Sequence, residues 1–276
     1  MTHTPTELRA LLADHGLEPS RALGQNFVAD PNTVRRIVRL AEVGPGQRVV
    51  EIGAGLGSLT LALVEAGADV TAVEVDRHLL PILREVVEPH GVRVVAGDAT
   101  QLDWHEVLGP PDPDRPWVLV ANLPYNIATP LVLDLLAGAP QIERMLVMVQ
   151  LEVGERLAAR PSAKAYGIPS VKVAWWADAE VVGKVSPHVF VPVPRVASAL
   201  VAVRRHQPPG GDDLRREVFA LVDAGFGQRR KMLRRSLAGL RTPAQLEVAG
   251  IRPEARAEEL TLDDWLRLAQ VPASGA

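Results

Sequence analysis

The sequence contains no cysteine among its 276 residues, and this absence excludes several kinds of chemistry at once. Without thiols the chain can form no disulfide, no cysteine-ligated zinc site, no iron–sulfur cluster and no cysteine nucleophile. Methylation of a base carbon through a cysteine adduct is excluded for the same reason. Missing thiols also fit a reducing compartment, so we expect a cytoplasmic protein without a metal site.

Long apolar runs are lacking as well. No stretch of 18 apolar residues occurs, and the segment from Met1 to Glu18 lacks the charged and then apolar pattern of a signal peptide. We therefore expect no membrane segment. The sequence has no internal repeat or coiled-coil pattern that indicates an oligomer, so we expect a monomer.

The chain also has no excess of positive charge. Its net charge of −3, taken alone, argues against a nucleic-acid partner. However, residues 1–200 have a balance of −6, whereas residues 201–246 have a balance of +6. The mild acidity is an average over an acidic part and a basic part, so it does not exclude RNA.

Short β-branched runs alternate with helical patterns from residue 48 to about residue 203. This alternation predicts an α/β fold with a parallel sheet and helices on both of its faces. The predicted strands are 48–52, 69–74, 92–95, 117–121 and 145–150, and the predicted helices between the first three are 59–66 and 77–88.

The pattern changes after residue 205. Residues 206–213 (HQPPGGDD) are predicted to form a linker, and only helical patterns follow. Thr261, with Asp264 three residues later, predicts a capping box at the last helix. We predict a domain over 1–205 with a helical N-terminal segment over 1–47, and a small all-helical domain over 214–276, with helices at 214–226, 228–240, 243–249 and 262–269.

A glycine loop follows the first predicted strand. Gly53, Gly55 and Gly57 have the spacing G-x-G-x-G, with Glu51 two residues before the first of them. A dinucleotide fingerprint requires G-x-G-x-x-G, and Ser58 stands in its sixth position. The spacing therefore favours S-adenosylmethionine over NAD, although a tight turn between strand and helix is the simpler interpretation.

Two acids mark the ends of the next two predicted strands: Glu74 is the last residue of the second strand, and Asp98 follows the third. Glu74 is placed to accept hydrogen bonds from ribose hydroxyls, and Asp98 to accept one from an adenine amine. Either acid alone could be a solvated helix cap. Because strand ends of a parallel sheet meet at one edge, three such features together predict a nucleotide-type site there.

The fourth predicted strand ends in the sequence Asn122-Leu123-Pro124-Tyr125. The Asn122 oxygen and a backbone carbonyl of Leu123 or Pro124 could accept hydrogen bonds from an adenine amine and make its nitrogen more nucleophilic. Tyr125 offers a ring on which an extruded base can stack. Catalysis would then consist of positioning and polarisation; a strand stopped by proline is the structural alternative.

Taken together, these segments resemble the ribosomal RNA adenine N6,N6-dimethyltransferases, and most of all their KsgA-type branch, which acts on small-subunit (16S) rRNA. The resemblance extends from about residue 17 to residue 269. It rests on GQNFV at 24–28, EIGAGLGSLT at 51–60, Glu74, GDA at 97–99, NLPYN at 122–126, FVPVPRVAS at 190–198 and FGQRRKML at 226–233.

The resemblance implies a Rossmann-like class I fold and S-adenosylmethionine as cofactor. It implies dimethylation of two adjacent adenosines in the 3′-terminal hairpin of rRNA within a pre-30S particle, during ribosome biogenesis. By this resemblance, Phe190 would form a second aromatic wall of the target pocket. The alternative is that Phe190 is a phenylalanine of the core. By the same resemblance, the cofactor would be held by Asn26, Val28, Gly53, Gly55, Glu74, Asp98 and Asn122. Leu151 departs from the family's usual lysine.

The basic run of FGQRRKML is the expected RNA contact. On a helix over 228–240, three leucines fall on one side and the cations on the other. No acid of that helix pairs with these cations, which favours phosphate contact over a merely solvated face. The predicted RNA-binding residues are Arg229, Arg230, Lys231, Arg234 and Arg235.

Three other functions remain open from the sequence. A large-subunit adenine methyltransferase of the macrolide-resistance type shares the cofactor motifs, but the combination of NLPYN, FVPVP and FGQRRKML favours the small-subunit type. A ribosome-assembly factor would depend on RNA binding more than on catalysis. A small-molecule methyltransferase has no use for the basic helix.

Overall fold

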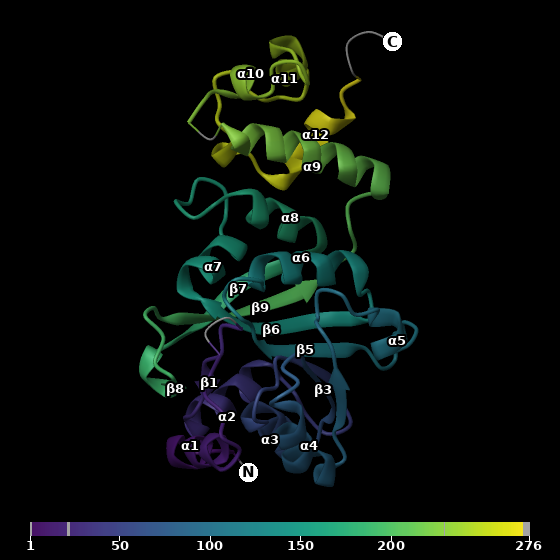
Figure 1. Ribbon diagram of the computed structural model, residues 1–276. Helices are drawn as coiled ribbons and strands as arrows, with labels where there is room; N and C mark the ends of the chain where they lie inside the picture. Colours follow the sequence, from purple (N-terminus) through teal and green to yellow (C-terminus); the bar gives the residue numbers. More distant parts are fainter. Residues whose placement is uncertain (1, 21–22, 229, 273–276) are drawn as a thin grey trace. The chain divides into compact units, whose positions relative to one another are not determined.

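A computed structural model of the chain describes residues 2–20, 23–228 and 230–272. The chain forms two compact units (Figure 1): unit 1 contains residues 1–154 and 179–205, and unit 2 contains residues 155–178 and 206–276. The predicted first domain, residues 1–205, includes 155–178, which belong to unit 2. In the structure this stretch holds the helix α8 Ile168–Trp176, whose Trp175 is buried in the core of unit 2.

Unit 1 is built on a seven-stranded sheet with the order β4-β3-β2-β5-β6-β9-β7. The five strands from β4 to β6 in this order run parallel to one another, as predicted. Their bounds are close to the predicted ones because β-branched runs between turn residues mark buried strands. They are β2 Arg48–Ile52, β3 Asp69–Glu74, β4 Arg93–Ala96, β5 Trp117–Asn122 and β6 Ile142–Gln150.

Helices cover both faces of this sheet (Figure 1), with α3 and α4 on one face and α6 on the other. Right-handed crossovers explain this division, since the strand order reverses direction at β2. The helices and turns of unit 1 are α1 Pro5–Asp14, α2 Pro31–Leu40, α3 Ser58–Glu65, α4 Leu80–Val87, η1 Glu88–His90, α5 Trp104–Leu108, α6 Ala128–Gly138 and η2 Pro187–Val189, and α7 Leu151–Leu157 crosses from unit 1 into unit 2.

The sheet continues at one edge beyond the five predicted parallel strands. β9 Ser198–Arg205 runs antiparallel to β6, and β7 Ala177–Val185 lies beyond it. A separate ribbon pairs β1 Phe27–Val28 with β8 Phe190–Val191. Neither β7 nor β9 is among the predicted strands, and local sequence patterns carry no information on the direction of such long-range pairing.

Unit 2 is helical, as predicted. Its first long helix begins at Asp212, inside the predicted linker, and the capping box of Thr261 and Asp264 is present. Trp175, Trp265 and Leu233 are among its fully buried side chains. Besides α8, unit 2 contains α9 Asp212–Gly227, α10 Leu233–Ser236, α11 Pro243–Val248, η3 Ala257–Glu259 and α12 Leu262–Gln270.

The predicted continuous helix over 228–240 is wrong. Met232 has an extended backbone with ψ 149°, and of the described residues in this range only the four of α10 are helical. The N–H groups of Leu233 and Arg234 donate to the carbonyls of Ala255 and Pro253 at 2.8 and 3.1 Å. Because the chain segment at 253–255 takes these donors, they are not available to continue the preceding turn.

Within the described ranges, no helix is both long enough and apolar enough to cross a membrane.

Candidate active site

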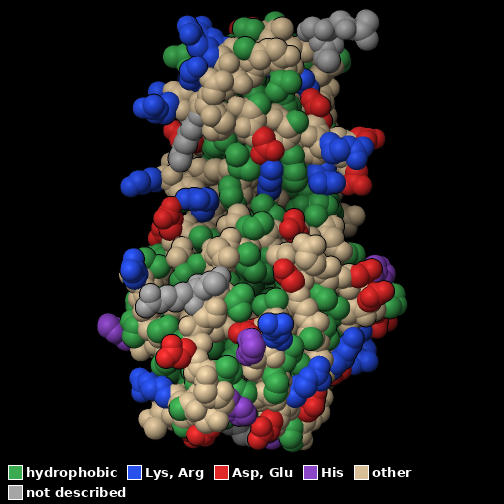
Figure 2. Space-filling model, viewed as in Figure 1, with side chains coloured by type: hydrophobic (Ala, Val, Ile, Leu, Met, Phe, Trp, Pro, Cys, Tyr) green, Lys and Arg blue, Asp and Glu red, His purple; other side chains and the backbone are tan. Residues whose placement is uncertain are grey.

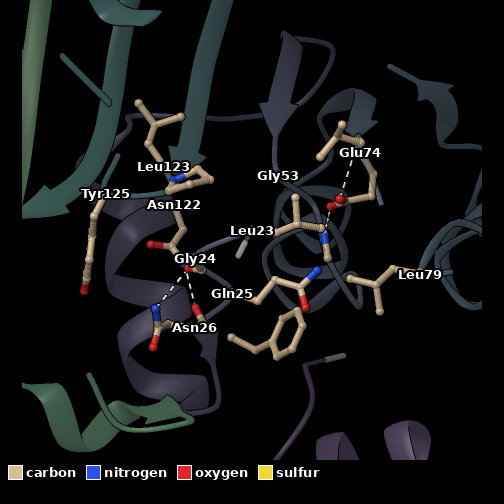
Figure 3. A pocket seen from close by; sticks show the side chains of 14 residues that line it. Leu23, Gly24, Gln25, Asn26, Gly53, Glu74, Leu79, Asn122, Leu123 and Tyr125 are labelled. Carbon is tan, nitrogen blue, oxygen red and sulfur yellow. Dashed lines mark hydrogen bonds between the residues drawn. The ribbon is translucent and has the colours of Figure 1, made fainter. Parts of the chain in front are cut away.

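A cleft of unit 1 opens at the carboxyl ends of β2, β3 and β5 (Figure 3). It is lined by residues 23–27 of the N-terminal segment, the glycine loop, the end of β3 and the segment after β5. This is the edge of an open α/β sheet at which ligands bind. The structure thus brings most of the predicted site together, namely Asn26, Gly53, Gly55, Glu74, Asn122, Leu123, Pro124 and Tyr125.

The glycine loop needs glycine for its conformation and for space. Gly53 and Gly55 have φ of +73° and +59°, values that side chains disfavour. A Cβ built on Gly55 would lie 2.9 Å from Cε1 of Phe27. The loop therefore leaves the backbone of Gly53 exposed, whereas Phe27 fills the space beside Gly55.

Glu74 ties the loop to the end of β3. Its carboxylate accepts hydrogen bonds from the N–H of Gly55 at 2.8 Å and from those of Val75 and Asp76 at 2.9 Å each. Burial raises the pKa of Glu74, while these N–H groups oppose that rise by stabilising the charged form. The result is a buried carboxylate with a fixed orientation at the cleft wall.

The N-terminal segment forms the opposite wall through hydrogen bonds of its own. Gln25 Nε2 donates to Asp76 Oδ2 at 2.7 Å, and Gln25 Oε1 accepts from the N–H of Ser20 at the same distance. Gln25 belongs to the GQNF motif but is not among the predicted site residues. Its role as a brace between the segment and the end of β3 depends on a contact across 51 residues, which no local pattern reveals.

Asn122 has its side chain fixed by that same segment. Its Nδ2 donates to the carbonyl of Asn26 at 2.9 Å, so its Oδ1 is left as an acceptor. Figure 3 shows this oxygen directed toward the side of the cleft that holds Tyr125. The orientation suits an acceptor for an amine located between Asn122 and Tyr125.

The backbone carbonyls of Leu123 and Pro124 differ in whether they accept a hydrogen bond. The carbonyl of Pro124 accepts from the N–H of Ile127 at 3.2 Å, whereas that of Leu123 accepts no hydrogen bond within the described part of the chain. The N–H of Leu123 donates to Met148 at 3.0 Å and fixes the turn. Of the two carbonyls considered from the sequence, Leu123 therefore offers the free one.

A smaller pocket adjoins the cleft, with which it shares Gly53 and Asn122. We call it the hollow; Val28, Glu51 and Ser58 form part of its lining. Glu51 is 2% exposed, and burial, opposed by a 2.6 Å hydrogen bond from Thr60, raises its pKa to about 8. The Ser58 hydroxyl is buried without a partner in the described residues. Polar groups in such a state are available to a polar ligand.

The cleft and this hollow suit S-adenosylmethionine. The bare glycine backbone gives room for its chain, Glu74 can accept hydrogen bonds from ribose, and Glu51 and Ser58 can pair with an amino-acid end.

Two predicted residues lie away from the cleft. Asp98 is exposed after β4 and accepts hydrogen bonds from the N–H and hydroxyl of Thr100 at 2.9 and 2.8 Å. Phe190 is only 1% exposed and belongs to the core cluster of unit 1, opposite Val28 in the ribbon of β1 and β8. The structure therefore places Phe190 in the core, which was the alternative, and not in the cleft wall.

The predicted RNA-binding residues lie in unit 2. Arg230, Lys231, Arg234 and Arg235 are exposed, and Arg229 lies outside the described residues. Figure 2 shows Lys and Arg side chains over the end of unit 2 that holds α10 and α11. We call these four side chains the basic surface.

The helical arrangement predicted for these cations is replaced by a turn and the short α10. Leu240, expected beside Leu233 and Leu237, is 47% exposed while the other two are buried. Arg234 pairs with Glu254 at 3.4 Å, an acid outside the expected helix. Within the described ranges, the other three cations form no ion pair.

Known proteins resemble this chain over almost its whole length. The family model described as ribosomal RNA adenine dimethylase matches residues 18–273. The ribosomal RNA small subunit methyltransferases A of Thermobifida fusca and Leifsonia xyli are each 50% identical to it, covering 97% and 96% of this chain and 95% and 96% of their own lengths. The crystal structure of the 23S rRNA methyltransferase ErmE matches with a TM-score of 0.67 and 29% identity, over 89% of this chain and 98% of its own.

A dimethyladenosine transferase from Plasmodium falciparum has the same fold, with a TM-score of 0.69 and 22% identity over 87% of this chain and 94% of its own. The match of the family model and the identity to curated relatives both extend across the cleft and the basic surface. The chain therefore belongs to the ribosomal RNA adenine dimethylase family, a family of S-adenosylmethionine-dependent methyltransferases.

Proposed function

We propose that this chain transfers methyl groups from S-adenosylmethionine to the N6 amines of two adjacent adenosines in the 3′-terminal hairpin of small-subunit rRNA. The observation that carries this function is the pair of acceptors beside Tyr125. Asn122 Oδ1 is oriented by the Nδ2 hydrogen bond to Asn26, and the carbonyl of Leu123 accepts no hydrogen bond from any described residue. An exocyclic amine has two N–H groups, and the two oxygens match them in number and in kind.

These acceptors address the poor nucleophilicity of the adenine amine. Its nitrogen lone pair is delocalised into the ring, and two hydrogen bonds from its N–H groups favour a tetrahedral nitrogen with a localised pair. Fixed acceptors cost no reorganisation during reaction. Since the methylated amine becomes cationic before it loses a proton to solvent, no general base is required.

When bound, S-adenosylmethionine supplies a methyl group activated by a sulfonium centre. We assign Glu74 to its ribose, Gly53 and Gly55 to the backbone cradle, and Asn26 and Val28 to the adjoining wall. Asp98 has one carboxylate oxygen, Oδ2, without a hydrogen bond in the described residues. This oxygen is our candidate for the adenine amine of the cofactor.

Tyr125 is the proposed stacking platform for the target adenine. It lines the cleft beside Asn122 and Leu123, and stacking on an aromatic ring contributes about 1–3 kcal/mol per base. This contribution offsets part of the free energy needed to extrude the base from its helix. Phe190, buried opposite Val28 in the ribbon of β1 and β8, would support that ribbon instead of stacking on the base.

We assign the basic surface to rRNA phosphates within a pre-30S particle. Apart from Arg234, its exposed cations form no ion pair with a described residue. Such cations attract the phosphate backbone without reading its sequence. Arg229, outside the described residues, would extend the same run. We further propose that the chain acts as a monomer in the cytoplasm, where ribosomal subunits mature, and that the two units correspond to catalysis and RNA contact.

A large-subunit target is the second candidate, because ErmE, a 23S rRNA methyltransferase, shares the fold at 29% identity. The relatives named for the small subunit are 50% identical, which favours the small-subunit target. An assembly factor that binds RNA without methylating it has the same basic surface but needs no oriented Asn122.

Methyl transfer from radiolabelled S-adenosylmethionine to undermethylated 30S and 50S subunits tests the function directly. We expect label in the 30S subunit only, recovered after nuclease digestion as N6,N6-dimethyladenosine at two adjacent positions. Label in the 50S subunit would favour the second candidate. Binding of the 30S subunit without label would favour the assembly factor.

A further inference from the structure

The segment FVPVPRVAS reaches the cleft through its last residue and not through its first. The hydroxyl of Ser198 lies 3.1 Å from the hydroxyl of Tyr125, across 73 residues of sequence. Ser198 is 0% exposed. A buried hydroxyl therefore meets the far end of the ring that we assign to base stacking.

Ser198 is held firmly by its backbone. It is the first residue of β9 and lies opposite Gln150, the last residue of β6. Directly beside this pair, the N–H of Leu151 donates to the carbonyl of Ala197 at 2.9 Å. With its backbone fixed and one side-chain torsion, Ser198 offers a hydroxyl at a nearly constant position.

Tyr125 has less support from its own segment. It lies in the turn between β5 and α6 and is only half-buried. The backbone hydrogen bonds of this turn are made by Leu123, Pro124 and Ile127, and none of them fixes the torsions of the Tyr125 side chain. The hydrogen bond to Ser198 restrains the ring at the end opposite its attachment.

We propose that Ser198 is a positioning residue that holds the Tyr125 ring in the orientation needed to stack on the target adenine beside Asn122. The inference rests on the proposed function, because it gives the ring a base to receive. It assigns the terminal serine of FVPVPRVAS a role in the reaction, whereas the phenylalanine of that segment belongs to the core. Ser198 acts through Tyr125 and touches no reacting atom.

The contact can be observed without RNA or cofactor. The chain has two tyrosines, so labelling with tyrosine enriched in 13C at Cζ gives two NMR signals. Tyr166 donates its hydroxyl to the carbonyl of Leu260 at 2.8 Å in unit 2 and is the internal reference. In Ser198→Ala we expect the Tyr125 signal to shift and the Tyr166 signal to stay.

The effect on catalysis is read from a double-mutant cycle in single-turnover methyl transfer at saturating substrate. Loss of one neutral hydrogen bond corresponds to about 3- to 10-fold in rate. We expect Ser198→Ala and Tyr125→Phe each to lower the rate by this factor. Because both variants remove the same hydrogen bond, Ser198→Ala should lower the rate no further in the Tyr125→Phe background.

Ser170→Ala is the matched control. Ser170 is also buried and donates to a backbone carbonyl, that of Arg156, but it lies in unit 2. The Ser170→Ala variant should leave the Tyr125 signal unchanged. Thermal unfolding of both serine variants measures any loss of stability.

Two results would overturn the proposal: an unchanged Tyr125 signal in Ser198→Ala, or an equal further loss of rate from Ser198→Ala in the Tyr125→Phe background. The second result would mean that Ser198 only supports the fold. If the wild-type chain transferred no methyl group at all, the proposed function would fail. The NMR signals would still decide whether Ser198 restrains the ring.

Discussion

The cleft and the basic surface use polar groups in opposite ways. In the cleft, Glu74 and Asn122 are held by hydrogen bonds to backbone atoms, and glycine is required at Gly55 by space as well as conformation. On the basic surface, Arg230, Lys231 and Arg235 are exposed and form no ion pair with any described residue. The first arrangement fixes individual atoms, whereas the second only concentrates charge.

This difference follows from the two tasks that we assign. Polarising an amine requires acceptors within hydrogen-bond distance of two particular hydrogens, so small displacements are costly. Attraction of phosphates acts over several ångströms and tolerates mobile side chains. We therefore expect substitutions in the cleft to cause large, local and salt-independent losses, and substitutions on the basic surface to cause graded, salt-dependent ones.

The largest effect on the fold is expected from Gly55→Ala. A residue with a Cβ at this φ costs about 1–2 kcal/mol, and the added methyl would also collide with Phe27. We expect loss of stability in chemical unfolding and at least about tenfold weaker binding of S-adenosylmethionine by calorimetry.

Gly91→Ala is its control, because Gly91 has φ +81° but open space around it. It should show the conformational cost without loss of cofactor binding. Equal cofactor affinity in the two variants would contradict the close packing of the loop against Phe27.

An intermediate effect is expected from the buried Glu51. Its pKa of about 8 in the folded chain exceeds the ordinary value of 4.5, so the folded state binds the extra proton between these two pH values. The stability that protonated Glu51 contributes is fully present below pH 4.5 and is lost as the pH rises through 8, by at most about 1.4 kcal/mol per pH unit.

Urea unfolding of the wild type and Glu51→Gln between pH 5 and pH 8 measures this loss. The free energy of unfolding of the wild type should fall relative to that of Glu51→Gln as the pH rises. Glu85→Gln, at an exposed position on α4, makes the same change of charge and should run parallel to the wild type. A constant difference between the wild type and Glu51→Gln would show that the pKa of Glu51 is not raised in the folded chain.

The smallest effect on the fold is expected from alanine at Arg230, Lys231 and Arg235 together. Each lost phosphate contact lowers the slope of log affinity against log salt by about 0.7–0.9, so the slope for rRNA binding should fall by about 2–3. The matched control is the triple alanine variant of Arg216, Arg252 and Arg267, which are paired with acids in unit 2. If both variants gave the same slope, phosphate contact would not be specific to the basic surface.

The sequence predicted the cleft well because each of its parts follows from a local rule. Buried parallel strands read as β-branched runs, and the glycines, Glu74 and Asn122 all follow strand ends, which must meet at one edge. The partner atoms could not be predicted in this way. Neither the hydrogen bond of Asn122 to Asn26 nor that of Tyr125 to Ser198 has a local signal, since they join residues 96 and 73 positions apart.

The errors have the same origin. A leucine spacing typical of a helix was present over 228–240, but the segment at 253–255 takes the backbone donors at Leu233 and Arg234. Phe190 belongs to a family motif, yet its position opposite Val28 in a two-stranded ribbon directs it into the core. In both cases a long-range contact overrides a local pattern.

The central claim is that Asn122 is needed for chemistry and the basic surface for RNA binding. One single-turnover experiment on undermethylated 30S subunits tests it, with the affinity for the subunit measured alongside. For Asn122→Ala the account predicts a loss of about 10²–10³ in rate, the size typical of removing one preorganised polar group, with unchanged affinity. The triple alanine variant at Arg230, Lys231 and Arg235 should bind more weakly but react at the wild-type rate once saturated. Two results would contradict the account. One is a wild-type rate for Asn122→Ala; the other is a rate below that of the wild type for the triple alanine variant even at saturating concentrations of the subunit.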